Sequence, residues 1–271
     1  MDSWVDGQPA DSLSLKDRGL AYGDGLFETI AVKAGQPLLL ERHLQRLAEG
    51  CQRLAIAADH DLVRRELLAY AGALGDGVLK LILTRGDSQR GYTADPAAAP
   101  RRILQGNPPA AYPAVHALQG VRLFPCTTRL STQPLLAGLK HLNRLEQVLA
   151  RAEWQGSDCA EGLMLDLDGR VIEGVFSNLF MVCEGVLITA DLRRCGVAGV
   201  MRGELLSRAA ALGIPTEITD ISLQQLQQAD EVFVCNSVYG IWPVCAYAAL
   251  SWPVGPLTRK LQGIARALLD A

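Results

Sequence analysis

Lys140 is followed directly by His141 and stands at the start of an amphipathic run, LKHLNRLEQVLAR, which extends over residues 139–151. A lysine acts as a Schiff-base nucleophile only when its amine is neutral, so this chemistry requires a lowered pKa. The apolar residues of the run recur at helical spacing and are Leu142, Leu145, Val148, Leu149 and Ala152. This pattern predicts a helix over residues 142–154 with one face packed inward. Lys140 would then lie just before or within the first turn, where the helix dipole disfavours an ammonium. The alternative is an ordinary solvated charge.

A carboxylate and a glycine-rich joint are two further candidates for a site. Glu173 interrupts the apolar strand pattern RVIEGVFSNLFMV, and a buried carboxylate requires a cation. It could face a protonated pyridine nitrogen, or it could be a strand-edge glutamate in water. In CGVAGVMRGELL, glycines precede a helix whose first amide groups could hold a phosphate, although many such joints are simple turns.

Composition argues against several other classes of function. The formal net charge is −3 and no basic cluster occurs, so we expect no nucleic-acid partner. The four histidines and seven cysteines show no metal-ligand spacing, so we expect no metal site and buried thiols in place of disulfides. The chain contains no long apolar run and no basic segment followed by an apolar one. We therefore expect no membrane insertion and a cytoplasmic location.

Strand-like apolar runs alternate with helical patterns, which indicates an α/β or α+β architecture. In the first part we expect a hairpin over residues 26–40, helices over 41–56 and 61–74, and a strand over 78–84. In the second part we expect strands over 121–126 and 231–237, a meander over 162–190, and helices over 200–212 and 256–269. Prolines interrupt the pattern at residues 105–114. They predict a smaller domain over residues 1–107, a linker over 108–114, and a larger domain over 115–271 that carries Lys140.

Together these stretches resemble the fold type IV family of pyridoxal-phosphate enzymes. That family includes D-amino acid and branched-chain aminotransferases and the aminodeoxychorismate lyases. The matching motifs follow the family order along nearly the whole chain and are RGLAYGDGLFETI, ERHLQRL, LTRGDSQRGY, GLKHLNRLEQVLAR, EGVFSNLF, CGVAGVMR and VFVCNSVYGIWPV. The run KHLNRLEQVLAR, the methionine of GVMR and the CNS triplet are most similar to the lyases. The resemblance implies a two-domain D-amino acid aminotransferase-like fold and a homodimer.

The resemblance also implies that the chain binds pyridoxal 5′-phosphate. Lys140 would carry this cofactor as a Schiff base, and Glu173 would hold the proton on its pyridine nitrogen. The positions that match the remaining cofactor contacts are Arg46, Asn178, Val200, Met201, Asn236 and Ser237. A surface charge is the alternative for Arg46, and a capping or turn role is the alternative for the two asparagines.

Three residues match positions that face the substrate in the family, namely Thr29, Arg90 and Tyr92. Phe27 and Thr29 alternate along one strand, so their side chains should lie on the same face. Arg85 is expected to be structural.

The activity implied by the resemblance is conversion of 4-amino-4-deoxychorismate to 4-aminobenzoate and pyruvate, a step in folate biosynthesis. Transamination of a D-amino acid or a branched-chain amino acid on the same fold is the alternative. A small-molecule binder without turnover is a second alternative, and retention of both Lys140 and Glu173 speaks against it.

Overall fold

The computed structural model describes residues 2–89, 91–95, 97–156 and 158–270, and the chain divides into two compact units. The first unit comprises Met1–Ala110, Leu139–Asn143 and Asp270–Ala271, and the second comprises Ala111–Gly138 and Arg144–Leu269. The boundary after Ala110 lies within the segment predicted as a linker. The division differs from the predicted one because the segment around Lys140 groups with the first unit.

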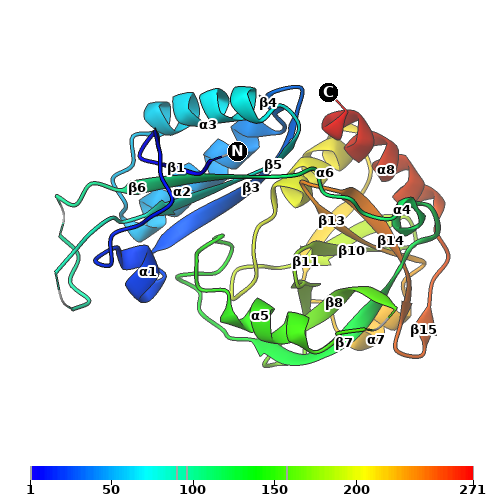
Figure 1. The fold of residues 1–271 in the computed structure, drawn as a ribbon. Helices are drawn as coiled ribbons and strands as arrows, with labels where there is room; N and C mark the ends of the chain where they lie inside the picture. The colour runs from blue at the N-terminus through cyan, green and yellow to red at the C-terminus, as the bar shows by residue number, and fades with distance from the viewer. Residues whose placement is uncertain (1, 90, 96, 157, 271) are drawn as a thin grey trace. The chain divides into compact units, whose positions relative to one another are not determined.

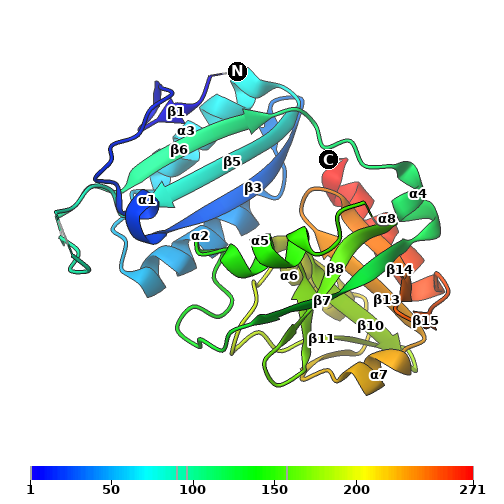
Figure 2. The ribbon, with the colours of Figure 1, turned by 60° about the horizontal axis from the view of Figure 1, so that its bottom comes forward.

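The first unit is an antiparallel sheet with two long helices against one face (Figures 1 and 2). Its strands are β1 (Trp4–Val5), β2 (Gln8–Pro9), β3 (Gly25–Lys33), β4 (Gln36–Pro37), β5 (Gly77–Thr84) and β6 (Arg101–Asn107), in the order β2-β1-β6-β5-β3-β4. Its helices are α1 (Arg18–Tyr22), α2 (Leu40–Leu54) and α3 (His60–Leu74). The predicted hairpin exists, since Ala34 and Gly35 adopt positive φ in a tight turn between β3 and β4. Its second strand is shorter than predicted, because α2 begins at Leu40.

Alternation along β3 separates the two faces of this sheet. Leu26 and Ile30 are buried in the core formed with α2 and α3, whereas Phe27 and Thr29 are half-buried and belong to the opposite face. The helical face predicted within residues 41–56 is confirmed by burial of Leu44, Leu47 and Cys51.

The second unit contains a strand circuit that closes on itself. Its strands are β7 (Val121–Leu130), β8 (Cys159–Asp166), β9 (Val171–Gly174), β10 (Asn178–Cys183), β11 (Val186–Ala190), β12 (Thr216–Thr219), β13 (Glu231–Asn236), β14 (Gly240–Tyr247) and β15 (Leu250–Ser251). The path runs β10-β13-β14-β7-β8-β9, and pairing of β9 with β10 closes it into a small barrel. The helices of this unit are α4 (Ala114–Gln119), α5 (Leu145–Ala152), α6 (Val200–Ala211), α7 (Leu223–Gln227) and α8 (Pro256–Leu269).

The helix predicted over residues 142–154 is shorter than expected, and its apolar residues are exposed where we expected them to be buried. α5 covers only Leu145–Ala152, and its apolar residues Leu145, Val148 and Leu149 are 75%, 61% and 60% exposed. Its buried side chain is Ala150, and Trp154 is buried just beyond the helix. The prediction that the apolar face packs inward is therefore wrong.

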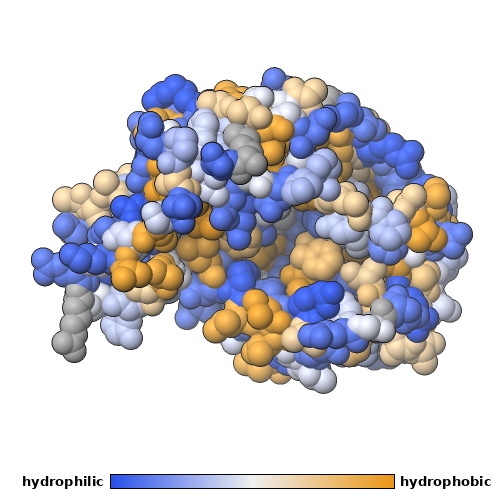
Figure 3. Space-filling view, in the orientation of Figure 1, coloured by the Kyte–Doolittle hydropathy of each residue, from blue (hydrophilic) through white to orange (hydrophobic). Residues whose placement is uncertain are grey.

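Among the described residues, no helix combines the length and the apolar character needed to cross a membrane. On the face drawn in Figure 3, hydrophobic and hydrophilic residues are interspersed.

Candidate active site

The segment that carries Lys140 is an extended edge of the first unit's sheet. The N–H of Phe27 donates to the carbonyl of Lys140 at 2.9 Å, and the N–H of Leu142 donates to the carbonyl of Gly25 at 3.0 Å. The Lys140 Nζ lies 4.3 Å from the centroid of the Phe27 ring. Since α5 begins only at Leu145, Lys140 lies outside its first turn. The prediction that the helix dipole acts on this amine is therefore wrong. The structure instead places the amine against an aromatic ring.

Arg46, the predicted phosphate ligand, contacts a buried carboxylate of β3. Its Nε donates to Glu28 at 2.8 Å and its Nη2 also contacts that carboxylate, while His43 Nδ1 lies 2.6 Å from the second carboxylate oxygen. Burial alone would raise the pKa of Glu28, but the charge of Arg46 and the contact with His43 lower that pKa to about 2. Burial lowers the pKa of His43, and its Nε2 has no hydrogen-bond partner among the described residues. The ionised Glu28 thus orients the guanidinium of Arg46.

Sequence reasoning missed Glu28 and His43. A signal existed, because Glu28 occupies an inward position of β3 between buried Leu26 and Ile30, and His43 precedes Arg46 by three residues on α2. A buried carboxylate beside a helix with a cation and an imidazole on one face indicates an ion-pair cluster.

Glu173 is buried at the end of β9, where neutral donors approach its carboxylate. The N–H of Val197 donates to it at 2.8 Å, and the Asn178 side-chain amide lies 3.5 Å away. The same amide donates to the carbonyl of Val197 at 2.8 Å and accepts from the N–H of Gly199 at 3.0 Å. Asn178 therefore joins Glu173 to the segment that leads into α6.

The N-terminus of α6 can present backbone amide groups to a ligand. Gly199 is its N-cap and no side chain caps it, and the first intrahelical bond runs from the N–H of Gly203 to the carbonyl of Gly199. Val200 and Met201, the predicted phosphate contacts, are the first two helical residues, so their amides precede the helical ladder. This position suits an anion.

Asn236 closes the turn that carries Ser237. Its Oδ1 accepts from the N–H groups of Val238 and Tyr239 at 2.9 and 3.0 Å, and its amide donates to the carbonyl of Phe176 at 3.3 Å. Pairing of Asn178 with both Glu173 and Cys235 places these residues at one end of the barrel. The second unit therefore gathers Glu173, Asn178, the start of α6 and the Asn236–Ser237 turn.

A second buried glutamate, which the sequence reasoning also missed, supports this end of the barrel. Glu161 in β8 accepts hydrogen bonds from the N–H groups of Val175 and Phe176 and from the hydroxyl of Ser177, at 3.0, 3.4 and 2.6 Å. Burial raises the pKa of Glu161 to about 7, although these donors act in the opposite direction. Because residues 175–177 join Glu173 to Asn178, Glu161 fixes the turn between two predicted cofactor contacts. The carboxylate inside the apolar run CAEGLMLD was the available signal.

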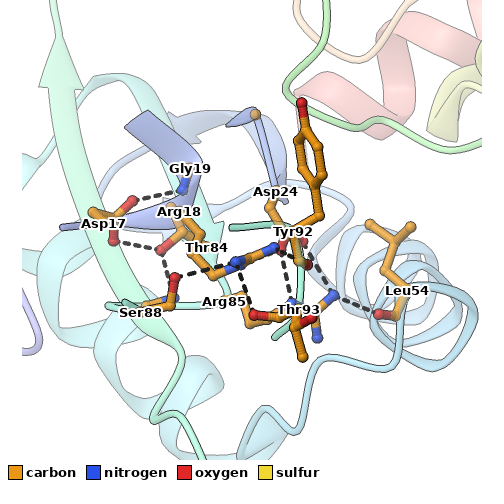
Figure 4. A network of polar contacts seen from close by, with 12 residues as sticks. Asp17, Arg18, Gly19, Asp24, Leu54, Thr84, Arg85, Ser88, Tyr92 and Thr93 are labelled. Atoms are coloured by element: carbon orange, nitrogen blue, oxygen red, sulfur yellow. Dashed lines mark hydrogen bonds and ion pairs between the residues drawn. The ribbon is translucent and has the colours of Figure 1, made fainter. Parts of the chain in front are cut away.

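The predicted substrate residues lie on the first unit. Thr29 is half-buried on the same sheet face as Phe27, and Tyr92 is 87% exposed on the loop after β5. Arg90 is outside the described residues. Arg85 is structural, as predicted, since it contacts Asp24 and the carbonyls of Leu54 and Ala55 (Figure 4).

In the described part of the chain, no group of three or more His, Cys, Asp or Glu side chains is arranged to hold a metal ion.

Comparison with known proteins extends these observations. A sequence model of the family described as "Amino-transferase class IV" matches residues 25–247. Over 266 residues the chain is 38% identical to aminodeoxychorismate lyase of Vibrio harveyi, covering 96% of this chain and 98% of the relative. The crystal structure of 4-amino-4-deoxychorismate lyase from Pseudomonas aeruginosa matches with a TM-score of 0.98 at 65% identity, covering 99% of this chain and 100% of that one. D-alanine aminotransferase of Bacillus licheniformis is 26% identical and covers 93% of this chain and 89% of the relative.

The family match covers most of the chain. It includes β3, with which the Lys140 segment pairs, and the end of the barrel that carries Glu173. The fold type IV architecture predicted from the motifs is confirmed by the structural match. The chain belongs to the class IV aminotransferase family of pyridoxal-phosphate enzymes.

Proposed function

We propose that the chain is a pyridoxal-phosphate-dependent lyase that converts 4-amino-4-deoxychorismate to 4-aminobenzoate and pyruvate, in folate biosynthesis. The observation that carries this proposal is the 65% identity, over 99% of the chain, with the lyase from Pseudomonas aeruginosa. Fold alone would not distinguish a lyase from an aminotransferase, because one scaffold hosts both activities. Identity at this level over the full length favours the lyase.

The chain's own groups fit pyridoxal 5′-phosphate. In the second unit the uncapped start of α6 suits a phosphate, and in the first unit Arg46, oriented by Glu28, offers a charged donor that suits the same kind of group. Glu173 is 3% exposed at the end of β9, and its buried carboxylate would hold the proton on the pyridine nitrogen of the cofactor. When bound, the cofactor supplies an electron-withdrawing ring that stabilises negative charge on the substrate carbon.

Each residue then has a definite task. Lys140 would hold the cofactor through its Nζ, and its amine would take the proton from C4 of the substrate. Glu173 retains the proton on the pyridine nitrogen, and Asn178 keeps the Glu173 carboxylate in place. Departure of the enolpyruvyl group from C3 as pyruvate makes the substrate ring aromatic, which provides the driving force.

The remaining groups bind rather than react. The amides of Val200 and Met201, the hydroxyl and amide of Ser237 and the guanidinium of Arg46 would hold the phosphate. Thr29, Tyr92 and Arg90 are assigned to substrate binding, and an arginine suits a substrate that bears carboxylates.

The test is an assay of the purified protein with 4-amino-4-deoxychorismate, in which pyruvate and 4-aminobenzoate are measured separately. We expect the two products in equal amounts, and we expect the Lys140→Ala variant to lose at least about 10³-fold in kcat because it lacks the amine. A variant as fast as the parent would remove Lys140 from the mechanism. Absence of 4-aminobenzoate would remove the lyase activity.

Transamination is the second candidate, and the similarity to a D-alanine aminotransferase favours testing it. Incubation with D-alanine or with a branched-chain amino acid would convert the bound cofactor stoichiometrically to its amine form if the chain is an aminotransferase. This conversion is followed by the loss of the cofactor's visible absorbance.

A homodimer in the cytoplasm completes the proposal, as the resemblance implies. Light scattering coupled to size-exclusion chromatography measures the mass in solution, and a single species of 29.2 kDa would contradict the dimer.

A further inference from the structure

The side chain of Arg18 is enclosed in the first unit, although it lies on a five-residue helix at the surface. Arg18 is 4% exposed, and its Nε donates to the Asp24 carboxylate at 2.8 Å. The helix itself is tied to β5, because its N-cap Asp17 accepts from the hydroxyl of Thr84 at 2.7 Å. The backbone that carries the Arg18 guanidinium is therefore held in place against β5.

The remaining donors of Arg18 converge on one short stretch of the loop after β5 (Figure 4). The Nη1 group donates to the hydroxyl of Ser88 and the carbonyl of Gly91, both at 3.1 Å. The Nη2 group donates to the carbonyl of Tyr92 at 2.9 Å. The hydrogen bonds described for the carbonyls of Gly91, Tyr92 and Thr93 all come from Arg18. A planar fork of donors can hold several backbone acceptors at once, which a single ammonium cannot do.

Apart from these contacts, the N–H of Ser88 donates to the carbonyl of Lys16 at 3.1 Å. None of the described residues between Ser88 and Ala99 is buried, so packing contributes little to its order. The ring of Tyr92 lies 5.4 Å from that of Tyr22, and the guanidinium of Arg18 lies 5.0 Å from the Tyr22 ring. One buried cation thus organises both the backbone and the aromatic side chain of the loop.

We propose that Arg18 is a positioning residue for substrate binding, because its buried guanidinium clasps Ser88 and the carbonyls of Gly91, Tyr92 and Thr93 and thereby places the loop that presents Tyr92. The proposal rests on the proposed function for the role of this loop toward the substrate. Arg18 itself binds protein groups through the contacts described above, so it acts through the loop and not by touching the substrate.

Arg85 provides a matched control. It shares the Asp24 carboxylate with Arg18, but its other described contacts are to the carbonyls of Leu54 and Ala55 at the end of α2. Arg18→Gln and Arg85→Gln therefore both remove one partner of Asp24, and only the first removes the clasp. Arg18→Lys is the companion variant, because it retains the buried positive charge beside Asp24 and loses the fork.

The first readout does not depend on activity. Trypsin cleaves after arginine, so cleavage of the Arg90–Gly91 bond, identified by mass spectrometry of the fragment that begins at Gly91, reports opening of the loop. We expect Arg18→Gln and Arg18→Lys to accelerate this cleavage about tenfold or more, and Arg85→Gln to leave it near the parental rate. Equal rates in the parent and both Arg18 variants would overturn the clasp.

The second readout is the split between KM and kcat for 4-amino-4-deoxychorismate. We expect the Arg18 variants to raise KM about tenfold while kcat stays within about threefold, and Arg85→Gln to retain the parental KM. Faster cleavage with an unchanged KM would overturn the role in substrate binding. If the parent itself lacks lyase activity, the proposed function fails, and the cleavage rates still decide whether Arg18 holds the loop.

Discussion

Two glutamates, one in each unit, are buried to the same degree and yet have opposite shifts in pKa. Glu28 is 2% exposed and Glu161 is 0% exposed. Burial raises the pKa of both carboxyls, but a guanidinium and an imidazole lower the pKa of Glu28 to about 2. Glu161 has only neutral donors in its described hydrogen bonds, and its pKa rises to about 7. The charge of the partners, and not the number of hydrogen bonds, decides the outcome.

The difference corresponds to two ways of building a cofactor site. In the first unit an ionised carboxylate holds a cation, Arg46, that is proposed to bind the phosphate. In the second unit Glu161 holds backbone amides and thereby fixes the turn that leads from Glu173 to Asn178. The ionised Glu28 orients the cation of Arg46, whereas Glu161, whose pKa is about 7, orders a turn of the backbone.

The comparison is tested most strongly by Glu28→Gln. This change leaves the partly buried Arg46 without its carboxylate, so we expect the free energy of unfolding at pH 7 to fall by about 3 kcal/mol in urea titrations. The loss should shrink as the pH falls from about 4.5 toward 2. In this range the Glu28 carboxyl becomes protonated, and it stabilises the fold only while it is ionised.

Glu41→Gln is the matched control on the same helix. Glu41 pairs with Arg64 at the surface, where solvent screens the charges, so this substitution should leave stability within experimental error. A loss in Glu28→Gln as small as that of the control would show that the buried cluster contributes nothing beyond a surface ion pair.

Glu161→Gln should give the opposite dependence on pH. Between about pH 4.5 and 7 the native carboxyl keeps its proton while the unfolded one loses it, so the native parent is destabilised as the pH rises. Over this window the stability of the parent relative to Glu161→Gln should fall by up to about 3 kcal/mol, as estimated from the shift in pKa. Urea titrations at pH 5, 6, 7 and 8 measure this difference. A flat difference across the series would contradict the raised pKa of Glu161.

The contrast between the two units also explains what the sequence could predict. The alternation of β3 and the inward face of α2 are local patterns. Both were predicted correctly, the first from Phe27 and Thr29 and the second from Leu44, Leu47 and Cys51. The family and its fold followed from the resemblance of the motifs to a known family, and composition or periodicity did not supply them. Assignment of the individual site residues to cofactor and substrate remains a prediction.

The errors arose where distant segments decide local structure. The segment around Lys140 pairs with β3, more than a hundred residues earlier, and this pairing delays the start of α5 to Leu145. An amphipathic pattern predicts that a helix has an apolar face, but it does not say whether that face packs on the core or lies exposed. The exposure of Leu145, Val148 and Leu149 could therefore not be foreseen. The partners of Glu28 and Glu161 are likewise set by tertiary packing, although each carboxylate was visible inside an apolar run.

The smallest expected effect is that of Ser177→Ala, which removes one neutral donor from Glu161. The serine hydroxyl donates to the carboxylate at 2.6 Å and lowers its pKa, so the variant should raise that pKa further. The cost should be about 1 kcal/mol of unfolding free energy at pH 8, typical of one hydrogen bond. In the Glu161→Gln background the same substitution should lose its dependence on pH, and the double-mutant cycle isolates that coupling. Identical pH profiles for Ser177→Ala in both backgrounds would mean that the hydroxyl does not help to set the pKa of Glu161. Burial would then determine that pKa without a measurable contribution from this neutral donor.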